Sequence, residues 1–337
     1  MTVELYRPWG QFQWLLNRYA ASSWDLIGCL STEDRCLAVR DVLHDRRGLR
    51  NVYLGQIGDD DSLYREVIEE KLEKRMQTLI ASGGAKEDVR KHRLFESPDI
   101  VISAIKAFLE ESEGNIIIDI SSFPKRFFFI IIKILLQNSR TKNLIATYTI
   151  PAQYRAGELA ENFEPWRPLP TFSGQSADTP IQVFFVGVGH ITMGLPEQLE
   201  SASGSLKIQI FIPFPGHPQS IKRNWQFVQT IEQALPGKII PRRIIPARDV
   251  SECFNHILVD TNCGQREALL APFGPKPLSL AMCLYACKAE HSRVYYTQPR
   301  VYPPDYSLGI GTIGGVPKIY GYCIRINGED QYTIPNQ

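Results

Sequence analysis

The sequence repeats one local pattern twice, and an internal repeat constrains a fold more than any single motif does. In each copy a short apolar strand is followed by a turn of small residues, a Pro-Lys pair and a long apolar helix. The first copy occupies residues 115–137 and the second residues 266–287. The lysines of the two pairs, Lys125 and Lys276, stand about half a chain apart. We therefore expect two copies of one structural unit.

The match extends to both sides of this pattern. After each apolar helix come a polar break and another strand, at residues 144–150 in the first half and 294–300 in the second. Two upstream apolar segments of the first half also have counterparts in the second. The matching pairs are 24–30 with 181–188, and 51–57 with 207–213. Sequence identity between the halves is low, so the repeat lies in the order and spacing of the elements.

Alternation of apolar strands with helices predicts a parallel sheet covered on both faces. Segments 116–120 and 183–188 are almost continuously apolar, which is typical of strands buried on both faces. We predict an α/β fold of two Rossmann-like parallel-sheet units in tandem, related by a pseudo-two-fold axis. The expected boundaries are a first unit at 1–154, a proline-rich linker at 155–180, and a second unit at 181–337 with a C-terminal β extension.

Composition excludes several classes of partner. The 37 basic and 36 acidic residues balance, so we expect no binding to bulk nucleic acid. The longest apolar run, 127–136, is interrupted by Lys133 and is too short to span a bilayer. The N-terminus lacks a signal-peptide pattern, and the seven cysteines lack metal-ligand spacing. We therefore expect a cytoplasmic protein without a membrane partner, metal site or cofactor.

The two lysine turns are the main candidates for a ligand site. In an open parallel sheet, ligands bind beyond the carboxyl ends of the strands, where helix N-termini point. Backbone N–H groups, the helix dipole, hydroxyls and a lysine together suit an anion. The candidate residues are Ser121, Ser122, Lys125 and Arg126 in the first half, and Gly274 and Lys276 in the second. The alternative is that each turn only caps its helix, with Ser122 as the N-cap.

Other candidates are weaker. Gly189 and His190 follow an apolar strand and are expected on the same sheet edge as the lysine turns, but the full dinucleotide-binding spacing is missing. Asp119 ends a buried strand, and a hydrogen bond to the following turn is favoured over a role as base or metal ligand. Tyrosines and arginines near the end of each half suit either base stacking with phosphate contact or closure of the sheet edge.

The strand, lysine turn and apolar helix resemble the CARF domains (CRISPR-associated Rossmann fold) and the related SAVED domains. The closer match is residues 273–281, and residues 122–126 are a more diverged copy. In these families a Gly-Thr-Lys-type turn lies at the centre of paired Rossmann-like units and contacts a cyclic oligonucleotide. Pro275 stands where the family has threonine, and the first copy lacks the glycine. The resemblance implies a nucleotide ligand held between the two turns.

Three functions are compatible with these observations. The first is a sensor of prokaryotic defence type that binds a small anionic nucleotide, with a separate chain as its effector. The second is a scaffold subunit that has kept the fold and lost the ligand. The third is an enzyme that cleaves a phosphodiester signal. The sequence contains no Ser-His-Asp arrangement or Walker motif, so we assign no catalytic residue and favour a binding protein.

Overall fold

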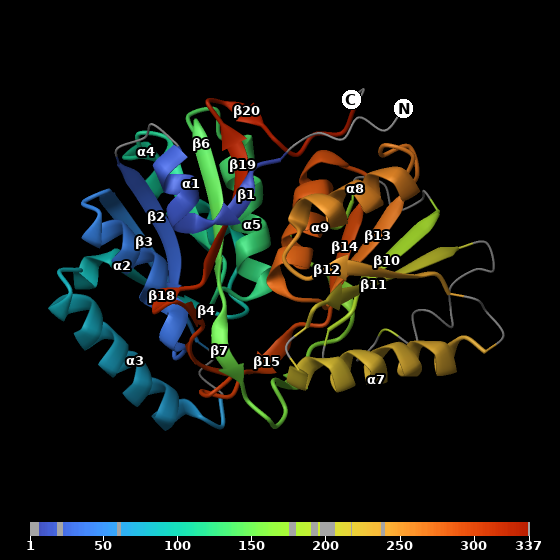
Figure 1. The fold of residues 1–337 in the computed structure, drawn as a ribbon, viewed down its shortest axis with the longest axis horizontal. Helices are drawn as coiled ribbons and strands as arrows, with labels where there is room; N and C mark the ends of the chain where they lie inside the picture. The colour runs from blue at the N-terminus through green and yellow to red at the C-terminus, as the bar shows by residue number, and fades with distance from the viewer. Residues whose placement is uncertain are drawn as a thin grey trace. The chain divides into compact units, whose positions relative to one another are not determined.

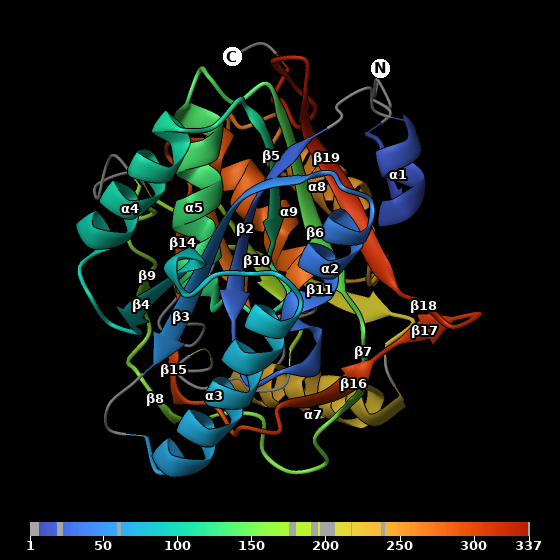
Figure 2. The same ribbon diagram turned by 90° about the vertical axis from the view of Figure 1, so that its left-hand side faces the viewer.

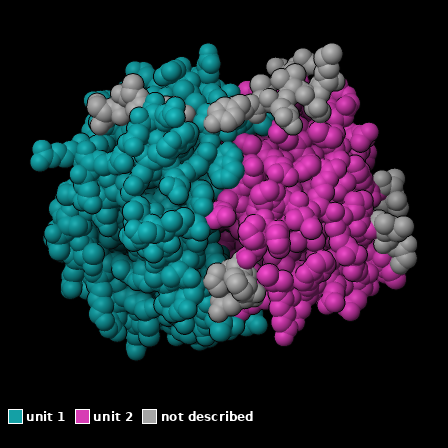
Figure 3. Space-filling model, in the orientation of Figure 1, with its two compact units in different colours: residues 1–161, 300–331 teal, residues 162–299, 332–337 magenta. Residues whose placement is uncertain are grey.

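The structure is a computed structural model, and it describes residues 7–18, 23–58, 62–174, 180–189, 195, 206–216, 218–236 and 240–335. The chain forms two compact units, shown in two colours in Figure 3. The first unit contains residues 1–161 and 300–331, and the second contains residues 162–299 and 332–337. The chain therefore leaves the first unit, builds the second, and then returns to the first.

The first unit is built on a sheet with five parallel strands at its centre. Their order across the sheet is β4 (Val89–Arg93), β3 (Leu49–Gly58), β2 (Trp24–Leu30), β5 (Asn115–Asp119) and β6 (Asn143–Thr149). Three antiparallel strands extend the sheet beyond β6, namely β19 (Ile319–Ile326), β1 (Trp9–Gln11) and the short β20 (Glu329–Asp330). All seven residues of β2 are buried, as expected for a strand covered on both faces.

Helices cover both faces of this sheet. The helical segments of the unit are α1 (Phe12–Arg18), η1 (Asp34–Leu37), α2 (Ala38–Asp45), α3 (Arg65–Ala81), η2 (Lys86–Asp88), α4 (Pro98–Glu110) and α5 (Lys125–Gln137). Side chains of α1 and α2 share one apolar cluster with β2, β5, β6 and β19. Helices α4 and α5 pack beside each other (Figure 2). Two small ribbons complete the unit, β7 (Pro151–Tyr154) with β16 (Ser307–Ile310) and β17 (Thr312–Ile313) with β18 (Val316–Pro317).

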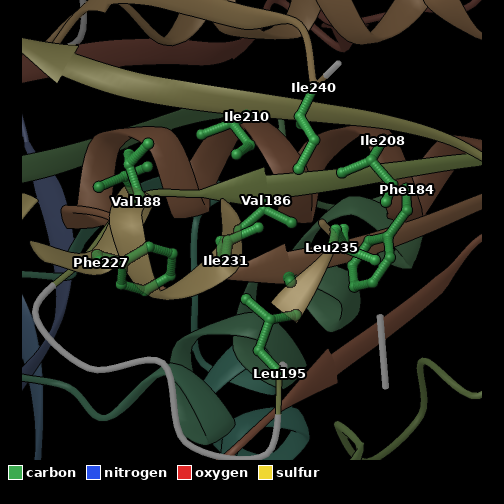
Figure 4. Packing of buried hydrophobic residues seen from close by; sticks show 12 residues of the cluster. Phe184, Val186, Val188, Leu195, Ile208, Ile210, Phe227, Ile231, Leu235 and Ile240 are labelled. Atoms are coloured by element: carbon green, nitrogen blue, oxygen red, sulfur yellow. The ribbon is translucent and has the colours of Figure 1, made fainter. Parts of the chain in front are cut away.

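The second unit has a sheet of the same kind. Its five parallel strands are ordered β12 (Arg242–Pro246), β11 (Lys207–Phe214), β10 (Val183–Gly187), β13 (Ala268–Pro272) and β14 (Arg293–Tyr296). The short β9 (Arg167–Pro168) adds antiparallel to β14. The helices are α7 (Pro218–Ala234), α8 (Val250–Asp260) and α9 (Lys276–Lys288). Alternate residues of β10 and β11 pack against α7 in the cluster of Figure 4.

The five parallel strands follow one order in both units. Numbered along the chain within each unit, they lie in the order third, second, first, fourth and fifth. The strand pairs matched in the sequence, β2 with β10 and β3 with β11, occupy equivalent places in the two sheets. The α/β fold with Rossmann-like parallel sheets is thereby confirmed. The expected pseudo-two-fold relation between the units stays a prediction.

The C-terminal β extension belongs to the first unit, and the expectation that it extends the second was wrong. Strand β19 lies between β1 and β6 in Figure 1 and pairs antiparallel with both. The physical reason is that β6 would otherwise present an open edge with unpaired backbone groups. Tyr322, Cys323 and Ile324 are fully buried there. The unit boundaries accordingly fall at 161 and 300, inside the segments β8 (Glu161–Phe163) and β15 (Pro299–Val301).

One smaller expectation also differs from the structure. Part of the predicted linker, 155–180, joins a sheet through β9, and residues 175–179 lie outside the described part of the chain. Among the described residues, no helix combines the length and apolar character needed to cross a membrane.

Candidate functional site

The turn after β5 is held to the neighbouring strand by Ser121. The Asp119 carboxylate accepts hydrogen bonds from the Ser121 N–H at 3.0 Å and from the Ser121 hydroxyl at 2.5 Å. The same Ser121 oxygen accepts from the Thr149 N–H at 2.8 Å, at the end of β6. Asp119 and Ser121 therefore join the carboxyl ends of two strands, and the structural interpretation of Asp119 is the one that the geometry supports.

Two buried hydroxyls lie at this turn without a hydrogen-bond partner. They are Ser122 Oγ, next in sequence to Ser121, and Thr149 Oγ1, on the residue whose N–H binds Ser121. Thr149 is 0% exposed. Buried polar groups are normally satisfied, so an unsatisfied one requires an explanation such as a ligand. Ser122 also fails to cap the helix: α5 begins at Lys125 with Pro124 as its N-cap residue, so that alternative was wrong.

The N-terminus of α5 lacks a side-chain cap, and no acidic residue lies in the first turn of the helix. The first helical bonds run from the N–H groups of Phe127 and Phe128 to the Pro124 oxygen. Lys125, at the first helical position, is only 9% exposed. Lys125 thus lies in the first turn of α5, at the end of the helix dipole that favours anions.

Arg126, the next residue of α5, is anchored to the loop after β4. Its Nη2 donates to the Glu96 oxygen at 3.2 Å, and its guanidinium lies 5.7 Å from the centroid of the Phe95 ring. Glu96 is fixed in turn, because its carboxylate binds His92 Nδ1 and accepts from the Arg93 N–H. The loop that carries Phe95 is therefore rigidly attached to the strand.

His92 continues this chain of contacts into the core. Its Nε2 lies 2.6 Å from the Tyr53 hydroxyl, so Tyr53, His92 and Glu96 form one buried hydrogen-bonded row. Burial, with the Glu96 carboxylate as a further cause, raises the pKa of Tyr53 above its ordinary range. The phenol therefore stays protonated, and its hydroxyl shares a hydrogen bond with His92 Nε2. This row positions the loop and is itself enclosed by the protein.

The turn after β2, at residues 31–34, is filled by the protein's own cations. Arg35 is 1% exposed; it forms two hydrogen bonds with Glu33 Oε2 and donates to the Thr149 carbonyl at 2.8 Å. Burial disfavours its charge, but the Glu33 carboxylate holds the pKa of Arg35 well above the usual value. The Ser307 hydroxyl also donates to Glu33. The carboxyl end of β2 is therefore covered by the returning C-terminal segment.

Asp34 in the same turn also binds within the protein. Its carboxylate pairs with Arg75 and accepts from the Gly309 N–H at 2.6 Å. Partial burial opposes ionisation, yet these contacts lower the pKa of Asp34. The Glu33 side chain makes no cap hydrogen bond to the helical segment that follows it. The Glu33 and Asp34 carboxylates both bind residues 307–309 of the segment that returns to the first unit.

In the second unit the lysine turn is packed more tightly. Helix α9 begins at Lys276, which is half-buried, and again lacks a side-chain cap. A Cβ atom on Gly189 would lie 2.0 Å from the Phe273 oxygen, and one on Gly274 would lie 3.2 Å from the Val188 oxygen. The two glycines are thus needed for close contact between two backbone turns. His190 lies outside the described residues.

Aromatic rings reinforce this packing. Phe273 stacks on Trp166, with centroids 5.8 Å apart and planes 11° apart, and also contacts Phe227 and Tyr296. In the first unit, the hydroxyls of Tyr148 and Tyr154 are 2.9 Å apart, and Tyr154 packs edge-on against Tyr306. Burial raises the pKa of both Tyr154 and Tyr306. In the part of the chain that is described, these tyrosines pack against each other inside the unit.

The structure thus brings Ser121, Ser122, Lys125 and Arg126 together at one turn, and Gly189, Gly274 and Lys276 at the equivalent turn of the other unit. Sequence reasoning missed Thr149, Glu96 and Arg35. Thr149 was detectable in principle, as a polar residue at the end of a buried strand next to the lysine-turn strand. Arg35 and Glu96 had no sequence signal, because their roles depend on partners distant in the chain. The described residues contain no group of three or more His, Cys, Asp or Glu arranged for a metal ion.

Comparison with known proteins identifies no family. No protein-family model matches the chain, and no curated protein matches it. Among solved structures, a protein of unknown function from Pseudomonas aeruginosa PAO1 is 10% identical over 83% of this chain and 94% of its own, with a TM-score of 0.23. The precorrin-6A reductase CobK is 12% identical over 84% and 90%, with a TM-score of 0.23. MurG of Acinetobacter baumannii is 11% identical over 81% and 85%, with a TM-score of 0.20. At such TM-scores the fold assignment depends on the strand order alone.

Proposed function

We propose that this chain is a binding protein that recognises the phosphate of a small nucleotide-type ligand at the turn between β5 and α5. The single observation that supports this most is the buried pair of unsatisfied hydroxyls, Ser122 Oγ and Thr149 Oγ1, beside an uncapped helix N-terminus. A phosphate has three acceptor oxygens and would accept hydrogen bonds from both hydroxyls. The strand edge where they lie is the usual ligand edge of a parallel sheet.

Lys125 supports the same proposal through its place as the first residue of α5. The N-terminal end of a helix carries a partial positive charge, which favours anions. A phosphate bound there would gain a charge-assisted hydrogen bond from the ammonium group. The resemblance to CARF and SAVED domains supports a cyclic oligonucleotide as the ligand and a defence-type sensor as the role. A separate effector chain would then respond to binding.

The first test compares Lys125→Ala with the unchanged chain. Calorimetry with inorganic phosphate, AMP and a panel of cyclic oligonucleotides should show that the unchanged chain binds. Lys125→Ala should weaken this affinity about ten- to hundredfold, because it removes one charge-assisted hydrogen bond. Lys106→Ala is the matched control, because Lys106 is an exposed lysine of the same unit. Its affinity should stay within about twofold, since a distant exposed charge interacts weakly.

Two outcomes would contradict the proposal. One is that none of these ligands binds the unchanged chain. The other is that Lys125→Ala loses stability while every affinity stays the same, which would make the turn purely structural. Separation of the products after incubation distinguishes binding from cleavage of the oligonucleotide.

A second candidate function is a scaffold subunit without a ligand. The specific observation in its favour is the second unit, where the turn of residues 187–189 packs directly on Phe273 and Gly274. Phe123 in the first turn is also buried, against Gly55. On our proposal the second turn has become structural while the first has kept its ligand. Lys276→Ala should therefore change affinity much less than Lys125→Ala does.

A further inference from the structure

We infer that His256 makes the attachment of helix α8 to the edge of the second sheet sensitive to pH. This inference concerns the second unit and is independent of the ligand proposed for the first. Strand β12 is the outermost strand of its sheet, and among the described strands it pairs with β11 alone. Helix α8 follows β12 in the chain and contacts it. A cluster of charged side chains joins the two elements.

The cluster is built around Asp260, the last residue of α8. The Asp260 side chain is only 5% exposed, and it binds two cations. Lys207 Nζ, from the first residue of β11, lies 2.8 Å from Oδ1, and Arg243 Nη1, from β12, lies 3.0 Å from Oδ2. A buried carboxylate is costly without charged partners, and these two cations supply them. Asp260 therefore ties the helix to two neighbouring strands.

His256 binds the same arginine from one turn earlier in α8. Its Nδ1 lies 2.9 Å from Arg243 Nη1, the nitrogen that also binds Asp260. A guanidinium group stays protonated and can only donate, so His256 Nδ1 must accept and carries no proton. The ring is therefore neutral, with its proton on Nε2. A second proton would enter at Nδ1, where it would replace this hydrogen bond by the contact of two positive charges.

The surroundings of the His256 ring also disfavour the second proton. The charged groups that face the ring are Arg243 from β12, and Glu252 and Asp260 from α8 itself. Glu252 Oε1 lies 3.6 Å from Nε2, which is beyond a normal hydrogen bond. From β11 the ring meets Phe211, with centroids 6.3 Å apart. Burial, and after it Arg243, lowers the pKa of His256, although the two carboxylates act in the opposite direction.

The other described neighbours of α8 contact it at other residues. Helix α9 meets α8 through Tyr285, which packs edge-on against Phe254. The end of the chain meets it through Tyr332, at Phe254 and at the Ser251 hydroxyl. The pH response of the ring is therefore set by α8, β11 and β12.

The sign of the effect follows from the linkage between protonation and folding. Because the folded state disfavours protonated His256, the unfolded chain takes up this proton at a higher pH than the folded chain does. The attachment is therefore at full strength above the ordinary histidine value of about 6.5, and it weakens as the pH falls below that value. Acidification should release Arg243 from the ring first, and thereby loosen α8 on the edge strand.

Nuclear magnetic resonance of the full chain with labelled histidine tests the titration itself. The His256 ring should become half-protonated at a lower pH than the histidines of the same chain unfolded in urea. Arg243→Gln should move this midpoint to higher pH, because it removes the nearest positive charge. The signals are assigned by their loss in His256→Asn. A midpoint at or above that of the unfolded chain, or one that Arg243→Gln leaves unchanged, would contradict the inference.

Urea unfolding at about pH 7.5 and about pH 5.5, on either side of the ordinary histidine value, tests the consequence for stability. His256→Asn keeps an acceptor near Nδ1 and cannot be protonated. Its free energy of unfolding should therefore fall less between the two pH values than that of the unchanged chain. His291→Asn is the matched control, because His291 is an exposed histidine of the same unit, and it should fall as the unchanged chain does. Equal falls in all three proteins would overturn the inference, and the titration of the unchanged chain decides it if His256→Asn does not fold.

Discussion

At the scale of single residues, the polar side chains on the ligand edge of the first unit fall into two sets. Glu33 pairs with Arg35 and accepts from the Ser307 hydroxyl. Asp34 pairs with Arg75 and accepts from the Gly309 N–H. Ser122 and Thr149 keep unused hydroxyl groups. The first set stabilises the fold, and on our proposal the second set binds the ligand. Substitutions in the two sets should therefore separate stability from binding.

The first set gives a stability prediction for Glu33→Gln. This change leaves the buried Arg35 charge without its partner, and breaking a buried pair from one side costs about 3–5 kcal/mol. Chemical denaturation followed by circular dichroism would measure the loss in the free energy of unfolding. Glu69→Gln is the control, because its pair with Arg65 is about two-thirds exposed on both sides and should contribute less than about 1 kcal/mol. Equal losses for the two variants would contradict the structural role given to Arg35.

At the scale of elements, the two ends of α5 differ in whether a side chain caps them. Ten of its thirteen residues are buried, so it is a core helix. Its start lacks a side-chain cap. Its end is covered by Arg325 of β19, which donates to the carbonyls of Leu136, Asn138 and Thr141 at 2.6–3.2 Å. A single guanidinium thus caps carbonyl groups at the end of the helix and in the turn that follows it, where the Asn138 carbonyl also accepts from the Thr141 N–H.

Arg325→Ala should accordingly destabilise the protein by about 2–3 kcal/mol, because several buried carbonyls lose a charged donor at once. Arg325→Lys should recover only part of this, since an ammonium group lacks the fork of donors. Urea unfolding curves for both variants would measure the effect. Arg140→Ala in the same region is the comparison: its contact with Glu110 is exposed, and its loss should fall below about 1 kcal/mol. An alanine variant as stable as the unchanged chain would show that water replaces the guanidinium.

The elements themselves could be predicted from sequence to a large extent, and the reasons are physical. Apolar runs and periodicity predict strands such as Ile116–Ile118 and helices such as α5, because these signals lie within the segment itself. The place of β19 could not be predicted, because pairing partners depend on which edge is open. The same limit applies to the site. Lys125 was found from its motif, whereas Thr149 contacts the same turn through Ser121, from a strand that is distant in sequence.

At the scale of the whole molecule, the second unit is nearly continuous in sequence and the first is not. We expect a fragment of residues 162–299 to melt cooperatively by itself, and a fragment of residues 1–161 to fail, since it lacks β19 and leaves the β6 edge open. Joining 1–161 to 300–331 through a short Gly-Ser linker should restore cooperative melting of the first unit. Near-ultraviolet circular dichroism and thermal melts would check all three. Independent folding of 1–161 would show that β19 is dispensable.

The insertion of one unit within the other also has a consequence for synthesis on the ribosome. Domains generally fold as their residues emerge, with the N-terminal one first. In this chain the order is reversed, because β19 is made after residues 162–299. Residues 1–161 therefore keep the edge of β6 unpaired while residues 162–299 are translated and fold. Nascent chains arrested before residue 319 should bind holding chaperones through β6, and release them once Ile319–Ile326 has left the exit tunnel.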